Sequence, residues 1–157
     1  MAGVLESVLA TLLMEEEELA ALIVLALKEQ EALVSADLGE IARVGDAMLV
    51  TASSLERLER TRESLLASID CEALTLDVLV PVAEQHSVEG FAEARLRLVA
   101  RAAELREAQE GNARLLLSAM RLQDKWMNMC GSLASPTYGA DGLQESQRGR
   151  RFVSRSA

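Results

Sequence analysis

The sequence predicts an all-α protein: an elongated antiparallel helical bundle or coiled coil of three long helices and one short helix, with a flexible C-terminal tail. Hydrophobic residues make up 50% of the chain but aromatic residues only 3%, a composition typical of long helices packed side by side. Apolar residues also recur at helical spacing over long stretches. A chain of 157 residues is expected to hold one folded domain. We place this helical bundle at residues 1–135 and a mostly disordered tail at residues 136–157.

The first long helix is expected from about Val4 to Val34, a range without proline or glycine. Within it, leucine or alanine recurs at every seventh residue and is flanked by further apolar residues. Leu25 lies away from that column, so the apolar arc is too wide for contact with one helix. The first helix is therefore expected to need a second neighbour or a partner.

The second helix is expected to begin after Asp37. The Asp37 carboxylate can accept from the free amides of the first turn, while Glu40 reaches back in a capping-box arrangement. Residues 70–90 break the helical pattern, and we expect one short helix around Leu74 to Gln85 there. Ser87 is then expected to cap the last helix.

The last helix carries the clearest pattern in the chain, a six-heptad repeat in which Phe91 takes position a. Ten of the twelve a and d positions are apolar, which predicts a coiled-coil seam. Asn112 occupies an a position and is predicted to fix the register, because a buried amide must find a partner. The a positions are Phe91, Leu98, Leu105, Asn112, Ala119 and Trp126, and the d positions are Ala94, Arg101, Ala108, Leu115, Leu122 and Met129.

In its C-terminal half, the last helix has a second apolar stripe at b and e positions, beside the seam. The stripe is rich in methionine, whose flexible side chain suits surfaces that fit more than one partner. Two interpretations stay open: neighbouring helices cover both faces in a closed bundle, or the stripe accepts a helix from a client protein. On the second interpretation, the candidate client-binding residues are Leu116, Met120, Met127 and Cys130, together with Leu25 of the first helix.

Catalytic and metal-binding functions find little support in the sequence. The single histidine, His86, is followed by Glu89 and a helix break, which differs from the pattern of phosphotransfer domains. No glycine-rich phosphate loop, Glu-x-x-His pair or Cys-x-x-Cys motif is present. We therefore predict a protein that is not an enzyme and that uses no catalytic residue, metal or cofactor.

The charge is negative overall and unevenly distributed. Residues 1–135 hold 12 basic and 23 acidic side chains, whereas residues 136–157 hold four basic and two acidic ones. A body this acidic repels phosphates, so nucleic acid is not an expected partner. The tail arginines can contact RNA or anionic lipid, but a solvated tail is the simpler interpretation. These arginines are Arg148, Arg150, Arg151 and Arg155.

Neither membrane insertion nor secretion is expected. The longest apolar run, residues 19–27, is much shorter than the roughly 20 residues that a spanning helix needs. The amino terminus lacks the positive leader of a secretory signal and runs into glutamates 15–18. Two cysteines without a pairing pattern agree with a reducing compartment. The predicted location is the cytoplasm.

Short motifs run along the predicted helices and into the tail. The second helix contains Leu55-Glu56-Arg57-Leu58-Glu59 and Arg62-Glu63-Ser64-Leu65-Leu66. The last helix contains Leu105-Arg106-Glu107 and Asn112-Ala113-Arg114-Leu115-Leu116, and the tail contains Thr137-Tyr138-Gly139-Ala140-Asp141-Gly142. Together these segments resemble the FlgN family of flagellar type III export chaperones, over residues 1 to about 143.

The resemblance implies a cytoplasmic chaperone for the hook-associated proteins, which form the hook–filament junction. Family members bind the C-terminal helical segments of these clients, prevent their premature self-association and deliver them to the flagellar type III export gate. The resemblance also implies that Tyr138 docks on the cytoplasmic domain of that gate. The alternative is a structural coiled-coil adaptor or self-associating helical protein, and the client-free chain is a candidate homodimer through residues 19–27.

Overall fold

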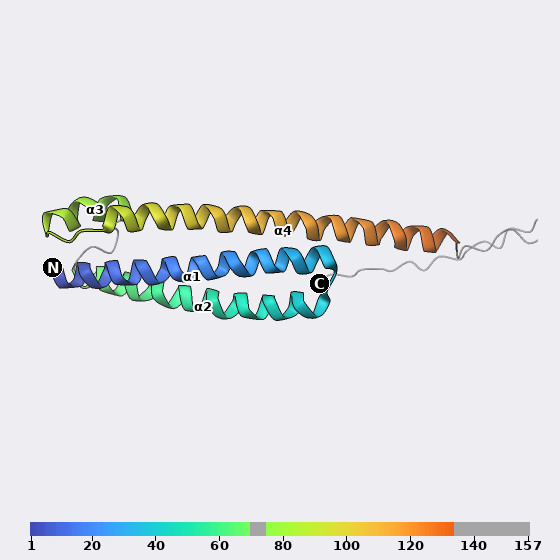
Figure 1. Cartoon of the computed structure of the whole chain (residues 1–157), viewed down its shortest axis with the longest axis horizontal. Helices are drawn as coiled ribbons and strands as arrows, with labels where there is room; N and C mark the ends of the chain where they lie inside the picture. The colour runs from blue at the N-terminus through green and yellow to red at the C-terminus, as the bar shows by residue number, and fades with distance from the viewer. Residues whose placement is uncertain (70–74, 134–157) are drawn as a thin grey trace, which may run out of the picture. The chain divides into compact units, whose positions relative to one another are not determined.

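The computed structural model describes residues 1–69 and 75–133, which fold as predicted into helices without strands. These ranges contain α1 (Ala2–Ser35), α2 (Leu38–Ala67), α3 (Leu76–Gln85) and α4 (Phe91–Leu133) (Figure 1). The chain divides into two units, Met1–Ala119 and Met120–Ala157, and each is described by itself. The expected tail, residues 136–157, lies outside the described residues, so the predicted domain boundary stays a prediction.

A tight turn joins α1 and α2 into an antiparallel hairpin (Figure 1). Ala36 takes a left-handed conformation with φ of 55°, and the Asp37 N–H donates to the Ala32 carbonyl at 3.0 Å. The Asp37 carboxylate accepts from the Glu40 N–H at 3.0 Å, which confirms the predicted cap. The predicted return contact from Glu40 is wrong, because its carboxylate accepts from Arg43 Nε at 2.8 Å instead. That hydrogen bond lowers the pKa of Glu40.

Ser87 ends α3 instead of capping α4, so the predicted role of this serine is wrong. Its φ of 60° is left-handed, and its N–H donates to Glu84 while the next N–H, of Val88, donates to Ala83 at 2.9 Å. This pair of bonds is the Schellman arrangement that closes a helix at its C-terminus. The buried Val88 side chain anchors the turn, and α4 begins three residues later at Phe91.

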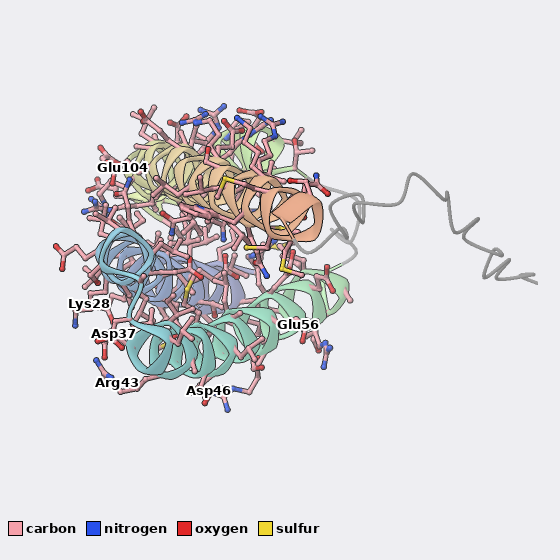
Figure 2. All side chains as sticks on the ribbon, turned by 90° about the vertical axis from the view of Figure 1, so that its right-hand side faces the viewer. Lys28, Asp37, Arg43, Asp46, Glu56 and Glu104 are labelled. Carbon is pink, nitrogen blue, oxygen red and sulfur yellow. The ribbon has the colours of Figure 1, made fainter. Side chains whose placement is uncertain are left out.

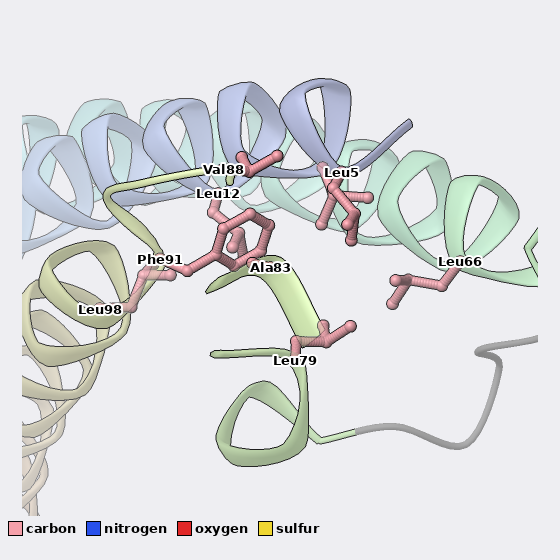
Figure 3. Packing of buried hydrophobic residues seen from close by; sticks show 9 residues of the cluster. Leu5, Leu12, Leu66, Leu79, Ala83, Val88, Phe91 and Leu98 are labelled. Atoms are coloured by element: carbon pink, nitrogen blue, oxygen red, sulfur yellow. The ribbon is translucent and has the colours of Figure 1, made fainter. Parts of the chain in front are cut away.

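The hydrophobic core of the first unit forms where all four helices meet (Figure 3). Phe91 is only 3% exposed and is the one aromatic side chain in this cluster. Burying side chains of this size stabilises the fold by about 1.5–3 kcal/mol each. The buried members of the cluster are Leu5, Val8 and Leu12 of α1, Leu66 of α2, Leu79 and Ala83 of α3, Val88, and Phe91 and Leu98 of α4.

The part of α4 in the first unit runs in the same direction as α1. Arg97 Nε donates to Glu16 at 2.8 Å, and farther along both helices the Asn112 amide donates to Ala26. Because α1 and α2 are antiparallel, α4 is antiparallel to α2. The antiparallel arrangement predicted from the sequence therefore holds for the direction of α2 relative to the other two long helices, whereas α1 and α4 are parallel in the first unit.

A buried ion pair joins α1 to α2. The Glu15 side chain is 8% exposed, and its Oε1 accepts from Arg62 Nε at 2.9 Å. Burial raises the pKa of Glu15 above its ordinary value of 4.5, and the contact with Arg62 offsets only part of that effect. A carboxyl group with a raised pKa favours the folded state below the ordinary pKa, and this contribution is lost as the pH rises through the folded-state pKa.

We expect Glu15→Gln to lower the free energy of unfolding at neutral pH by less than the roughly 3–5 kcal/mol that removal of one partner of a buried ion pair usually costs. The amide avoids the cost of burying a carboxylate and keeps an oxygen acceptor for Arg62. Urea unfolding between about pH 4 and pH 8 should show wild-type stability falling relative to the variant as pH rises. The exposed Glu17→Gln variant controls for the loss of one acid, and a pH-independent difference for Glu15→Gln would contradict this account.

Candidate functional site

The heptad seam of α4 is buried only in its first part. Phe91, Ala94 and Leu98 are buried, whereas Leu105, Ala108 and Leu115 at later seam positions are half-buried. From Ala119 to Ser132 every residue is exposed, although the apolar a and d positions continue to Met129. The sequence pattern thus extends farther along α4 than the burial does.

Asn112 fixes how α1 and α4 are aligned in the first unit. Its side chain is buried, and its Nδ2 donates to the Ala26 carbonyl and to Glu29 Oε2, both at 2.8 Å. The predicted cross-helix partner of this amide is therefore confirmed. In this register α1, which ends at Ser35, is long enough to run beside α4 as far as the end of the first unit.

The predicted client-binding residues of α4 are all exposed and share one helix face. Leu116, near the end of the first unit, is 51% exposed, and Met120 and Met127 of the second unit are 54% and 67% exposed. Cys130 is an exposed free cysteine. We call these four residues the second stripe. Their exposure agrees with a surface that is open to a partner, and their role in client binding stays a prediction.

Leu25 differs from the second stripe in its setting. It is half-buried on α1 in the first unit, whereas three of the four stripe residues belong to the second unit. Within the apolar run of residues 19–27, Val24 and Leu27 are about half exposed, at 52% and 49%, whereas Leu22 is buried. The exposed part of this run is therefore better represented by Val24 and Leu27 than by Leu25.

Sequence reasoning missed three exposed residues, because it assigned them to packing within the chain. Leu122, Trp126 and Met129 occupy seam positions and are 58%, 56% and 45% exposed. We call them the seam stripe. They lie about 100° around α4 from the second stripe, so one broad arc of this helix is apolar. The predicted end of the first helix at Val34 could have revealed them, because a helix of that length is too short to cover the whole seam of the last helix.

The remaining candidates from the sequence are the single histidine, the single tyrosine, and any metal site or membrane-spanning helix. His86 is exposed at the C-terminal end of α3. Tyr138 lies outside the described residues, so its predicted docking role stays a prediction. Among the residues that the structure describes, no cluster of histidine, cysteine and acidic side chains has the arrangement of a metal site. None of the described helices combines the length and apolar character needed to span a lipid bilayer.

Comparison with known protein families gives a match over most of the chain. The profile of the FlgN protein family matches residues 1–146, which include all four helices and the segment around Tyr138. No curated protein and no solved structure matches the chain. The family is one of chaperones that serve flagellar type III export and bind flagellar proteins. Because the match covers nearly the whole sequence, and the described part is a helical bundle with an uncovered apolar helix surface, the chain belongs to the FlgN family.

Proposed function

We propose that this protein is a cytoplasmic chaperone that binds the C-terminal helical segments of hook-associated proteins. It keeps these segments from associating too early and delivers the clients to the flagellar type III export gate. The observation that supports this proposal most strongly is the mismatch on α4, whose heptad pattern continues to Met129 while burial of the seam ends near Leu115. Membership of the FlgN family supports the same function.

The two stripes offer the contacts that a helical client needs. An amphipathic helix binds through anchors spaced at i, i+3, i+4 and i+7, and Leu122, Trp126 and Met129 repeat this spacing on the chaperone side. Tryptophan is enriched among residues that dominate binding energy, and methionine adapts to partners of different shape. The seam stripe is therefore proposed as the anchor of the interface, and the second stripe as its adaptable flank.

Holding and releasing a client require no energy source in this proposal. The net charge of −9 keeps the chain soluble while apolar side chains remain exposed. A client is passed to the gate when the gate complex has the higher affinity for it, because differential affinity alone shifts such an equilibrium. Client binding is tested by replacing Met120 and Met127 with glutamate. The affinity of this variant for the client and its thermal melting are both measured.

Tyr138 is proposed to dock on the cytoplasmic domain of the export gate. We expect Tyr138→Ala to leave client affinity unchanged and to weaken binding of the chaperone–client complex to that domain, measured by calorimetry. Loss of a tyrosine that anchors an interface commonly costs about 2 kcal/mol, or roughly 30-fold in affinity. Tyr138→Phe separates the ring from the hydroxyl group. Equal gate affinity of wild type and Tyr138→Ala would remove this role.

A second candidate function is self-association as a structural adaptor. It is favoured by the same exposed seam stripe, because a second copy of α4 carries a matching heptad pattern. Sedimentation equilibrium separates the two functions. A stable dimer at low concentration that takes up no client supports the adaptor, whereas a monomer that binds the client helix supports the chaperone.

A further inference from the structure

A different apolar surface lies in the first unit, along α2. Two adjoining hollows share Leu49 and Ala52 in their walls. The larger has a volume of about 550 Å³ and lies between α1, α2 and α4, and the smaller, of about 340 Å³, continues along α2. We call the two together the α2 groove. Leu49 is 69% exposed at its centre, so the groove presents a large apolar side chain without a cover.

The residues that line the α2 groove include four carboxylates and no lysine or arginine. Glu56 and Glu59 are within 3.2 and 3.8 Å of Arg60 and Arg62 on the same helix. Glu29 accepts from the Asn112 amide, and Asp46 forms no ion pair with any of the described residues. Asp46 and Glu56 project outward from α2 (Figure 2). Glu29 and Asp46 are thus the two carboxylates of the groove without a basic partner among the described residues, so the groove suits a ligand with an apolar centre and positive charge.

The chain itself carries such a segment outside the described residues. Residues 148–155 read Arg-Gly-Arg-Arg-Phe-Val-Ser-Arg. Four of these eight residues are arginine, two adjacent ones are Phe152 and Val153, and none is acidic. Arginine is well suited to this groove because its planar group binds carboxylates through two parallel hydrogen bonds. Charge and apolar character thus both match the surface described above.

The segment is also long enough to reach the groove. Gln109 of α4 lines the larger hollow, and the 24 residues of helix from Gln109 to Leu133 span about 36 Å. The 19 residues from 134 to 152 span at most about 63 Å when extended. The extended length of this segment exceeds the 36 Å of helix, so length does not prevent binding within one chain, and covalent attachment raises the effective concentration of the segment at the groove.

We propose that residues 148–155 bind in the α2 groove of the same chain, with Phe152 and Val153 against Leu49 and the arginines against the surrounding carboxylates. The segment is an internal ligand that covers the apolar surface of α2 and that any other partner of this groove must displace. The α2 groove is separate from both stripes of α4, and binding of the segment there does not depend on the proposed function.

The test is paramagnetic relaxation enhancement in the full chain. A nitroxide is attached at Ser156→Cys after Cys71 and Cys130 are replaced by serine, and backbone amide signals are recorded. We expect strong enhancement at Gly45, Leu49 and Ala52 and little at Leu13 of α1, with the groove signal falling at high salt. A sample that mixes isotope-labelled chains without nitroxide and unlabelled chains with nitroxide should show no enhancement. Enhancement there would place the segment on another copy and overturn the intrachain proposal.

Charge variants decide whether the contact is specific. Asp46→Arg and, separately, Leu49→Glu should remove the groove enhancement, and Arg150→Glu with Arg151→Glu should restore it in the Asp46→Arg background. Asp124→Arg, an equal charge change at an exposed α4 position outside the groove, should leave it intact. Circular dichroism confirms that each variant is folded. Equal enhancement in the Asp46→Arg and Asp124→Arg chains, or enhancement spread evenly over exposed amides, would overturn the proposal.

Discussion

Replacing Met120 and Met127 together by glutamate is expected to weaken binding of a client's C-terminal helix by about 100-fold or more. Each methionine that a client covers contributes about 1.5 kcal/mol or more through apolar burial, and each 1.4 kcal/mol is a factor of ten in affinity. Thermal melting should barely change, because both side chains are more than half exposed in the chain itself. Calorimetric titration with the client segment and melting followed by circular dichroism measure the two quantities.

A matched variant on the same helix separates apolar contact from charge. Arg121→Gln with Asn128→Glu changes the net charge by the same amount, and both positions lie on the side of α4 away from the seam stripe. We expect client affinity of this control to stay within a few-fold of wild type. If the methionine variant loses its thermal stability instead, the second stripe belongs to the core and the client interpretation is wrong.

Phe91 and Trp126 provide the sharpest contrast in stability, since both occupy a positions of one heptad repeat. Phe91→Ala is expected to lower the free energy of unfolding by about 3–5 kcal/mol, because Phe91 is 3% exposed within the core. Trp126→Ala is expected to change it by less than about 0.5 kcal/mol, because Trp126 is 56% exposed. The larger aromatic side chain should therefore matter far less to the fold.

Urea unfolding followed by circular dichroism measures both variants, since the second lacks the single tryptophan of the chain. Client affinity should show the reverse order, with Trp126→Ala weakening binding and the folded fraction of Phe91→Ala retaining it. Comparable destabilisation by the two substitutions would mean that the seam is covered along its whole length in the free protein.

Much of the fold was predictable because it rests on local signals. The long apolar periods located α1 and α4, and α1 begins and ends within about two residues of its predicted limits. Asp37 marked the start of α2, because a carboxylate that precedes a helical pattern satisfies amides that nothing else reaches. Asn112 marked a cross-helix contact, because a buried amide in an apolar seam needs a partner.

The errors came from residues whose roles depend on more than their own segment. The Glu40 carboxylate could accept either from the backbone N–H at the cap or from the Arg43 side chain. It accepts from Arg43, because the charged guanidinium is the stronger hydrogen-bond donor. Ser87 has a side chain that is well suited to capping a helix. However, Val88 packs in the core, and Ser87 therefore forms part of the turn that closes α3. Heptad periodicity places Trp126 on a seam, but only the length of α1 decides whether that seam has a neighbour within the chain.

The central claim is that the seam stripe is uncovered in the free protein and is covered by a client helix. Trp126 allows this claim to be tested without any substitution, since it is the only tryptophan and lies in the seam stripe. The measurement is acrylamide quenching of its fluorescence at concentrations where sedimentation shows a monomer, before and after addition of a hook-associated protein's C-terminal helical segment. We predict that Trp126 is readily quenched in the free monomer and becomes shielded, with emission shifted to shorter wavelength, when the segment binds. A tryptophan already shielded in the monomer, or one whose quenching does not change on client binding, would contradict the account.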